Sequence, residues 1–221
     1  MTTAREIKVY RDLMGANAEW AGKTRALLAE RGIAMVNIIS SPGSGKTTLL
    51  EHTIPALAGR LRFAVLEGDL ETTRDAERLD ALNIPVCQLL TGGSCHLEAK
   101  LVHHALRDLP LDALDVVVVE NVGNLVCPAE FDIGEGGKIA VLSVTEGEDK
   151  PLKYPLLFHE AVAAVITKTD LLPYVPFKLD ACLQYLAQAN AATPVFQVSS
   201  LTGAGMDAWL EWFVGFINQH R

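Results

Sequence analysis

One octapeptide constrains this chain more than any other feature: Ser40-Ser41-Pro42-Gly43-Ser44-Gly45-Lys46-Thr47. Residues 35–39 before it form a mainly apolar run typical of a strand, and residues 46–57 after it carry apolar side chains at helical spacing. A glycine-rich turn that joins a strand to a helix points backbone N–H groups at an anion, beside a helix N-terminus. The octapeptide therefore predicts a phosphate-binding loop.

The residue types of this loop suit a nucleotide. Lys46 supplies a positive charge to the β- and γ-phosphates, and the Thr47 hydroxyl can ligate Mg²⁺. Ser40 stands where the usual pattern has its first glycine, so the turn must accommodate a β-carbon there. The alternative is a glycine-rich turn that binds nothing. The residues expected to contact the nucleotide here are Gly43, Ser44, Gly45, Lys46, Thr47 and Thr48.

Composition limits the classes of protein that the chain can belong to. Its 221 residues, 49% hydrophobic and 21% charged, predict one globular domain with or without an appendage. The net charge of −8 argues against binding to nucleic acid. Residues 1–20 do not resemble a secretory signal, and no apolar run approaches the ~18 residues of a membrane span. We therefore expect a cytoplasmic protein without disulfides, whose four cysteines bind metal or pack in the core.

The first 32 residues are expected to form a helical arm, and residues 33–221 a phosphate-loop domain. Apolar residues recur at spacings of three and four between residues 4 and 30, and Gly32 is expected to end the helix. Gly15 and Gly22 weaken the pattern, so it predicts one helix or two. The arm either packs on the core or binds a partner, and its spacing does not decide between these.

Strand and helix patterns then alternate. The apolar run 116–119 is typical of a strand buried on both faces, as in parallel sheets covered by helices. The fold class is therefore an α/β doubly wound domain with a mostly parallel sheet. Strands are predicted at 35–40, 62–66, 86–90, 116–119, 138–144, 162–167 and 195–198, and helices at 46–57, 73–82, 97–107, 177–189 and 206–218.

Ligands of such sheets bind beyond the carboxyl ends of the strands. Asp69 and Glu120 follow two apolar strands, and with Thr47 they are expected to organise Mg²⁺, which prefers oxygen ligands. Asp75 is expected to orient the attacking water, and Gly123 to offer its N–H to a γ-phosphate. The alternatives are that Asp69 is a turn residue and that Asp75 is an acid favoured by a helix dipole.

The segment Thr167-Lys168-Thr169-Asp170 resembles the guanine-specificity signature Asn-Lys-x-Asp, with Thr167 in place of Asn. In that signature the aspartate accepts hydrogen bonds that adenine cannot donate, and the lysine stem packs on the base. Asp170 therefore predicts GTP rather than ATP, unless the segment is an ordinary turn. Ser200 and Leu201 resemble the loop that contacts the guanine oxygen.

A second chemistry is indicated by Cys95, His96 and Cys127, because thiolate and imidazole suit Zn²⁺ or Ni²⁺ better than Mg²⁺. Three ligands are one short of a closed tetrahedral site, which leaves a position for water, a partner or a second copy of the chain. The alternative is that these cysteines are buried apolar residues. Because Cys127 follows Gly123, we favour the metal site.

The remaining cysteines and histidines are assigned separately. Cys87 and Cys182 lie in apolar segments and are expected in the core. His103 and His104 are also considered, because seven positions beyond His96 returns to nearly the same helical face, and His104 is the candidate ligand of a second zinc or nickel ion. A solvated helix face is the alternative for this histidine.

Together these motifs resemble the hydrogenase nickel-incorporation GTPases (HypB), a dimerising class of phosphate-loop protein. The resemblance covers about residues 10–221, and its most specific parts are Cys95-His96 and the string from Glu120 to Pro128. It implies a slow GTPase with GTP-dependent dimerisation and a nickel or zinc site made by Cys95, His96 and Cys127 of both copies. It also implies a small zinc-containing partner protein and delivery of nickel to the large subunit of a nickel-iron hydrogenase.

The resemblance has one further departure and several rivals. Residues 1–34 contain no Cys or His, so the nickel-storage motif of many family members is not expected. A urease-type nickel GTPase would carry a Cys-Pro-His motif, which is absent. A small-molecule kinase with buried cysteines would turn over an acceptor, and a GTPase with a purely structural zinc would not exchange its metal.

Overall fold

The computed structural model describes the backbone of residues 4–69, 74–90 and 92–221, and side chains from residue 14 onward except those of 69–75 and 91. Seven parallel strands form one sheet in the order β3-β2-β4-β1-β5-β6-β7. This confirms the predicted α/β doubly wound fold. The strands are β1 (Ala34–Ser40), β2 (Phe63–Asp69), β3 (Val86–Leu90), β4 (Val116–Glu120), β5 (Gly137–Ser143), β6 (Ala161–Thr167) and β7 (Val195–Gln197).

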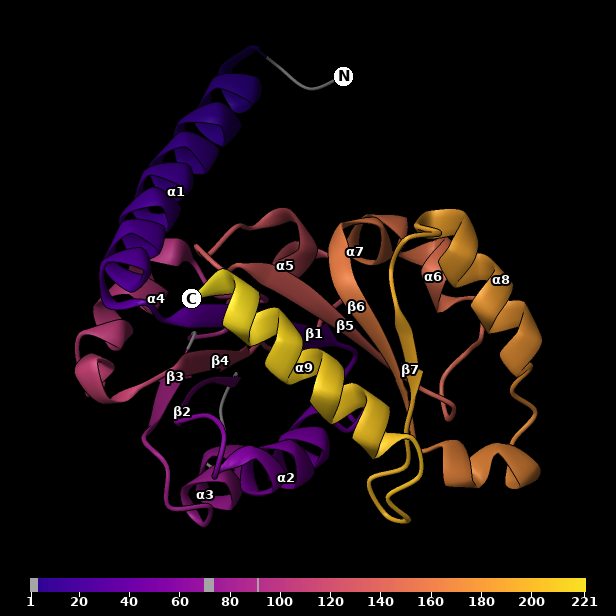
Figure 1. Cartoon of the computed structure of the whole chain (residues 1–221). Coiled ribbons are helices and arrows are strands. Elements are labelled where there is room, and N and C mark those ends of the chain that lie inside the picture. Colours follow the sequence, from indigo (N-terminus) through magenta and orange to yellow (C-terminus); the bar gives the residue numbers. More distant parts are fainter. Residues whose placement is uncertain (1–3, 70–73, 91) are drawn as a thin grey trace.

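Helices cover both faces of this sheet (Figure 1). One face of the sheet packs against α2, α3 and α9. The opposite face has two apolar clusters, one under α1 and α4 and one under α5, α7 and α8. The helices of the described residues are α1 (Ala4–Arg31), α2 (Lys46–Leu57), α3 (Arg74–Asp80), α4 (Ala99–Leu106), α5 (Cys127–Glu130), α6 (Lys150–Lys153), α7 (Pro155–Glu160), α8 (Leu179–Ala189) and α9 (Met206–His220), with 3-10 turns η1 (Leu111–Ala113) and η2 (Thr169–Tyr174).

The N-terminal segment is one continuous helix rather than two. Gly32 follows it with a φ of 63°, and the Ile33 N–H closes the helix end on the Leu28 carbonyl at 3.1 Å. Ala21 and Leu28 are buried where α1 meets the domain. Its neighbour is α4, where Asn17 Oδ1 accepts a hydrogen bond from the Ala99 N–H at 2.9 Å.

The helix predicted to begin at Leu97 begins instead at Ala99. Glu98 is its N-cap in an extended conformation, with φ −93° and ψ 148°. Cys95 and His96 therefore lie in the loop before α4 and not at the start of a helix. Figure 1 shows α4, which follows this loop, in the same half of the molecule as β4.

Candidate nucleotide pocket and metal cluster

The phosphate loop has the conformation that its glycines predict. Gly43 and Gly45 adopt positive φ angles of 73° and 90°, and Gly45 is the N-cap of α2. Lys46 is almost fully buried, and its Nζ donates a hydrogen bond to Ser40 Oγ at 3.1 Å. Ser40 is itself buried, so the loop accommodates the β-carbon at this position and uses its hydroxyl to hold the lysine.

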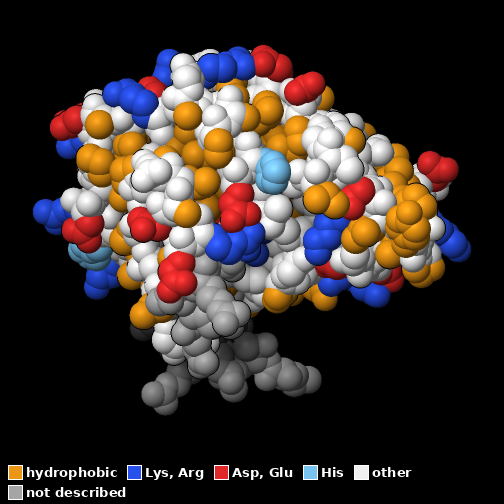
Figure 2. All heavy atoms as spheres, turned by 90° about the horizontal axis from the view of Figure 1, so that it is seen from below, with side chains coloured by type: hydrophobic (Ala, Val, Ile, Leu, Met, Phe, Trp, Pro, Cys, Tyr) orange, Lys and Arg blue, Asp and Glu red, His pale blue; other side chains and the backbone are white. Residues whose placement is uncertain are grey.

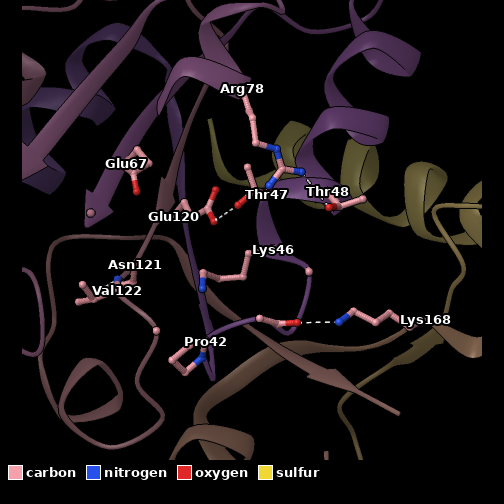
Figure 3. A pocket seen from close by; sticks show the side chains of 14 residues that line it. Pro42, Lys46, Thr47, Thr48, Glu67, Arg78, Glu120, Asn121, Val122 and Lys168 are labelled. Carbon is pink, nitrogen blue, oxygen red and sulfur yellow. Dashed lines mark hydrogen bonds between the residues drawn. The ribbon is translucent and has the colours of Figure 1, made fainter. Parts of the chain in front are cut away.

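The pocket beside this loop has a volume of about 440 Å³. Thr47 Oγ1 donates a hydrogen bond to Glu120 Oε1 at 2.7 Å, and Figure 3 shows the two side chains meeting inside the pocket. Glu67 lies opposite Glu120 on the neighbouring strand, and both carboxylates are buried. Two adjacent buried carboxylates and a hydroxyl form an oxygen-rich site that suits Mg²⁺.

Glu67 was not among the predicted ligands. Its signal in the sequence is that it directly follows the predicted strand 62–66, two residues before the predicted Asp69. Asp69 ends β2 and Asp75 lies in the first turn of α3, but the side chains of both lie outside the described residues. Their predicted roles in Mg²⁺ binding and water orientation therefore stay predictions.

Gly123 lies directly against the phosphate loop. A β-carbon at this position would be 2.7 Å from Pro42 Cγ and 2.9 Å from Pro42 Cα, so only glycine fits without a shift of the backbone. Gly123 also lines the pocket together with Lys46 and Thr47. A ligand that fills the part of this pocket beside Pro42 and Gly123 therefore contacts the segment that follows β4.

A second cavity, of about 290 Å³, adjoins the first and is suited to a base. It shares Gly45, Thr48 and Lys168 with the phosphate pocket. Ser199 Oγ donates to Asp170 Oδ1 at 2.5 Å, which fixes one carboxylate oxygen. The full lining is Gly45, Thr48, Thr167, Lys168, Asp170, Leu171, Ser200 and Leu201, so it contains every residue predicted for the base.

Thr167 and Lys168 join the base cavity to the phosphate loop. Thr167 Oγ1 donates to the Ser44 carbonyl at 2.6 Å, and Lys168 Nζ donates to the Gly43 carbonyl at 2.7 Å. Lys168 adopts a positive φ of 59°, which brings its stem over the loop. The threonine that replaces the usual asparagine therefore still binds the phosphate loop.

Two further residues near the pocket were not predicted. Glu146 Oε1 accepts hydrogen bonds from Ser44 Oγ at 2.6 Å and from the Ser143 N–H at 3.1 Å. Arg78 donates to Thr48 Oγ1 at 3.0 Å (Figure 3). The strand-end rule would have found Glu146, because it follows β5, whereas Arg78 reaches the pocket from a helix and leaves no such signal.

Cys95, His96 and Cys127 come together although 30 residues separate the last two from each other in the chain. Their nearest ligand atoms all lie within 4.8 Å of one another, and theirs is the one such group of three among the described residues. The Cys95 thiol lies 2.9 Å from Cys127 Sγ and 3.7 Å from His96 Nδ1. Two sulfurs and an imidazole are a donor set for Zn²⁺ or Ni²⁺.

The imidazole of this group is half-buried and packs on an aromatic ring. His96 Nε2 is buried without a hydrogen-bond partner in the described structure, and the ring packs on Phe131 with centroids 3.8 Å apart. Burial lowers the pKa of His96, which favours the neutral form that binds metals. The hydrogen bond with Cys127 raises the pKa of the Cys95 thiol.

The other candidate ligands lie outside this group. His104 is exposed, and its ring packs on Trp20 of α1 with centroids 5.2 Å apart. Cys182 is fully buried, and burial raises the pKa of its thiol to about 12. Cys87 is only partly buried and packs against the apolar cluster under α4, so of the two cysteines Cys182 alone has a fully buried core position.

The group of Cys95, His96 and Cys127 is called the metal cluster below. The segment that leaves the end of β4 links the pocket to this cluster. It begins at Glu120, passes Gly123 and reaches Cys127, the first residue of α5. Between them, Asn124 Nδ2 donates to the Cys95 carbonyl at 3.1 Å, and Asn124 Oδ1 accepts from the Val126 N–H at 2.9 Å. The same few residues therefore contact both sites.

The surface carries no broad basic area on the face drawn in Figure 2, where acidic and basic side chains alternate with apolar ones. This agrees with the net charge of −8. In the part of the chain that the structure describes, no helix has the length and apolar character that crossing a membrane requires.

Comparison with known proteins identifies the relatives of this chain. The family model described as "CobW/HypB/UreG, nucleotide-binding domain" matches residues 34–197. The hydrogenase maturation factor HypB of Azotobacter vinelandii is 46% identical over 212 residues, which cover 96% of this chain and 70% of that protein. The hydrogenase/urease maturation factor HypB of Helicobacter hepaticus is 41% identical over 200 residues, 89% of this chain and 82% of that protein.

Solved structures agree with these matches. The crystal structure of HypB from Helicobacter pylori in complex with nickel superposes with a TM-score of 0.88 at 35% identity, covering 92% of this chain and 96% of that one. HypB from Archaeoglobus fulgidus gives a TM-score of 0.87 at 33% identity, covering 92% of this chain and all of that one.

Proposed function

Because the chain belongs to the HypB family of hydrogenase maturation factors, within the CobW/HypB/UreG class of nucleotide-binding proteins, we propose that it is a GTPase that controls nickel delivery to a hydrogenase. GTP and Mg²⁺ bind in the phosphate pocket, and nickel or zinc binds Cys95, His96 and Cys127. The relative from Helicobacter pylori, whose structure is a complex with nickel, supports nickel as the cargo.

One contact carries this proposal: the segment that touches the phosphate loop also supplies a metal ligand. Gly123 packs against Pro42, and Cys127 lies four residues further along the same segment. Asn124 connects that segment to the loop of Cys95. A change at the γ-phosphate position can therefore alter the spacing of the two cysteine thiols.

The residues of the pocket have distinct roles in the proposed reaction. Lys46 and the loop N–H groups bind the phosphates, and Asp170 accepts hydrogen bonds from guanine. Thr47 and Glu120, with Asp69, would hold Mg²⁺, which supplies charge neutralisation at the β- and γ-phosphates. Asp75 would orient the water that attacks the γ-phosphate, so hydrolysis gives GDP and phosphate.

Hydrolysis then acts as a switch. While the γ-phosphate is present, the Gly123 N–H binds it and holds the segment to Cys127 in one position. After phosphate leaves, Gly123 loses this contact and the segment relaxes, which weakens the binding of metal at Cys127. GTP hydrolysis is thereby used as a signal for metal release.

The exposed metal cluster supports a homodimer in the GTP state. Cys95, His96 and Cys127 supply three ligands, one fewer than a closed tetrahedral site needs, and a second copy of the chain can supply the rest. The other proposed partners are a small zinc-containing nickel-insertion protein and the large subunit of a nickel-iron hydrogenase. Opening of the dimer after hydrolysis would hand nickel to them.

The test is a nickel titration of the wild type and of Cys127→Ala, each with GDP and with a non-hydrolysable GTP analogue, while the oligomeric state is followed. The wild type should bind nickel more tightly and form more dimer with the analogue. Cys127→Ala should lose this difference while its affinity for GTP is unchanged.

Cys87→Ala is the matched control, because this cysteine is also partly buried but lies outside the metal cluster. It should behave as the wild type. Equal nickel affinity and equal dimer fraction of the wild type in both nucleotide states would refute the proposal, and so would turnover of a small-molecule acceptor that Cys127→Ala does not affect.

A further inference from the structure

A buried chain of hydrogen bonds connects the two ends of the segment that carries Cys127. This segment, residues 121–135, leaves the end of β4 and returns just before β5. Asn121 Nδ2 donates to Asn37 Oδ1 at 3.0 Å, and Asn37 Nδ2 donates to Glu135 Oε1 at 3.3 Å. One amide on β1 therefore joins the first and the last residue of the segment.

Asn37 is an unusual residue for its position in the sheet. It lies between Met35 and Ile39 on one face of β1, and each of these neighbours belongs to an apolar cluster. Asn37 is fully buried at 0% exposure. Burying an amide is unfavourable unless its donors and acceptor are bonded, so an apolar residue would fill this position more simply. The amide makes a connection that no apolar side chain can make.

Each end of the segment makes further hydrogen bonds, of which one joins the first end to β1 and the others lie within the segment. Asn121 Oδ1 accepts from the Val122 N–H at 3.0 Å, and the Asn121 N–H donates to the Ile38 carbonyl at 3.0 Å. Glu135 Oε2 accepts from the Ile133 N–H at 2.8 Å. The base of the segment is thus bonded at each end, and Asn37 is the bridge between the ends.

We infer that Asn37 is a positioning residue that couples the nucleotide pocket to the metal cluster. A segment whose two ends are held at a fixed separation transmits a displacement at Gly123 to Cys127, whereas ends that can shift relative to each other would absorb that displacement. Asn37 contacts neither nucleotide nor metal in this role. The inference rests on the proposed function, because it explains how the two sites communicate.

The experiment compares Asn37→Ala with Val36→Ala, its matched control. Val36 is equally buried on the same strand but faces the opposite apolar cluster, so its truncation lowers stability without touching the segment. For each protein the nickel dissociation constant is measured with GDP and with a non-hydrolysable GTP analogue. The ratio of the two constants reports the coupling, and thermal unfolding reports stability.

The wild type and Val36→Ala should show a ratio of about tenfold, within the usual range of coupling between sites. In Asn37→Ala the ratio should fall close to one, while nickel affinity without nucleotide and affinity for GDP each change by less than about threefold. If Asn37→Ala does not fold, Asn37→Leu is used instead, since it has a similar size but can neither accept from Asn121 nor donate to Glu135. The same loss of the ratio is expected.

The outcomes separate this inference from the proposed function. A ratio of one in the wild type would overturn both. A wild-type ratio in folded Asn37→Ala or Asn37→Leu would overturn only the role of Asn37. A loss of the ratio in Val36→Ala as large as in Asn37→Ala would also overturn it, because general destabilisation would then explain the effect.

Discussion

Lys46, Thr47 and Glu120 of the phosphate pocket are nearly fully buried and hydrogen-bonded, whereas in the metal cluster Cys95 is exposed and Cys127 is half-buried. A buried, bonded pocket holds its side chains ready for one class of ligand and adds electrostatic strength by excluding water. A cluster with three protein ligands and an exposed cysteine remains accessible, so a bound metal ion can exchange with other ligands. This difference fits the proposed function, in which the pocket binds nucleotide selectively and the cluster exchanges its metal.

The largest expected effect comes from removing the buried charge of the pocket. Lys46→Ala should reduce GTP turnover about 100- to 1000-fold, because a preorganised group that faces the developing phosphate charge is lost. Turnover is measured as phosphate release under saturating Mg²⁺. Nickel binding without nucleotide should stay unchanged, and a parallel loss of it would mean that the two sites are not separate.

The second-largest expected effect comes from removing one ligand of the metal cluster, which should weaken metal binding alone. Cys95→Ala should weaken nickel binding by about 100-fold, since even residues that only support metal ligands contribute about 10- to 100-fold. Affinity for GDP, measured by calorimetry, should remain that of the wild type. Cys182→Ala is a suitable control, because this cysteine is buried in the core and far outside the cluster. Nickel affinity that survives Cys95→Ala would remove this residue from the site.

The third prediction separates recognition of the base from binding of the phosphates. Asp170→Asn should lower the preference for GTP over ATP by about tenfold or more, because a hydrogen bond to a charged group contributes about 1.5–3 kcal/mol. Competition between the two nucleotides measures this preference. Phosphate contacts should persist, so weak binding of both nucleotides is expected. An unchanged preference would place base recognition elsewhere.

The smallest effect concerns the amino ends of the strands, where Asp115 precedes β4. Hydrogen bonds from Arg62 lower the pKa of Asp115 to about 2. The ion pair therefore stabilises the fold above the ordinary carboxyl pKa of about 3.9, and this contribution is lost as the pH falls towards 2. Arg62→Ala should lower the melting temperature by about 2–4 °C at pH 7, given the partial exposure of the pair, and by little at pH 2.

This substitution also serves as a control for the two sites. Nucleotide and nickel affinity of Arg62→Ala should match the wild type, because its side chain lies at the amino end of the strand whose other end carries Glu120. A melting temperature that falls equally at both pH values would contradict the assigned pKa.

Local patterns explain what the sequence could predict. The phosphate loop and Glu120, the acid that ends β4, lie next to regular strands, so their place at the carboxyl ends of the strands follows from chain order. The short helices α5, α6 and α7 were not predicted, because their prolines resemble helix breakers. In the structure these prolines occupy first-turn positions, where no N–H is needed.

Tertiary contacts explain what the sequence could not predict. Glu67 and Asn37 are polar residues within mainly apolar strands, and only the tertiary structure shows what each side chain meets. The cluster of Cys95, His96 and Cys127 could be proposed from residue types, but its geometry depends on how two separate loops pack. His104 shared a helical face with His96 only if the helix began earlier than Ala99.

The central claim, that the buried pocket and the exposed cluster act as one switch, is tested most directly from the nucleotide side. The affinity for a non-hydrolysable GTP analogue, relative to GDP, is measured with and without saturating nickel. Because coupling between two sites is reciprocal, nickel should increase this preference by the same factor, about tenfold, by which the analogue strengthens nickel binding. A preference that nickel leaves unchanged would contradict the account.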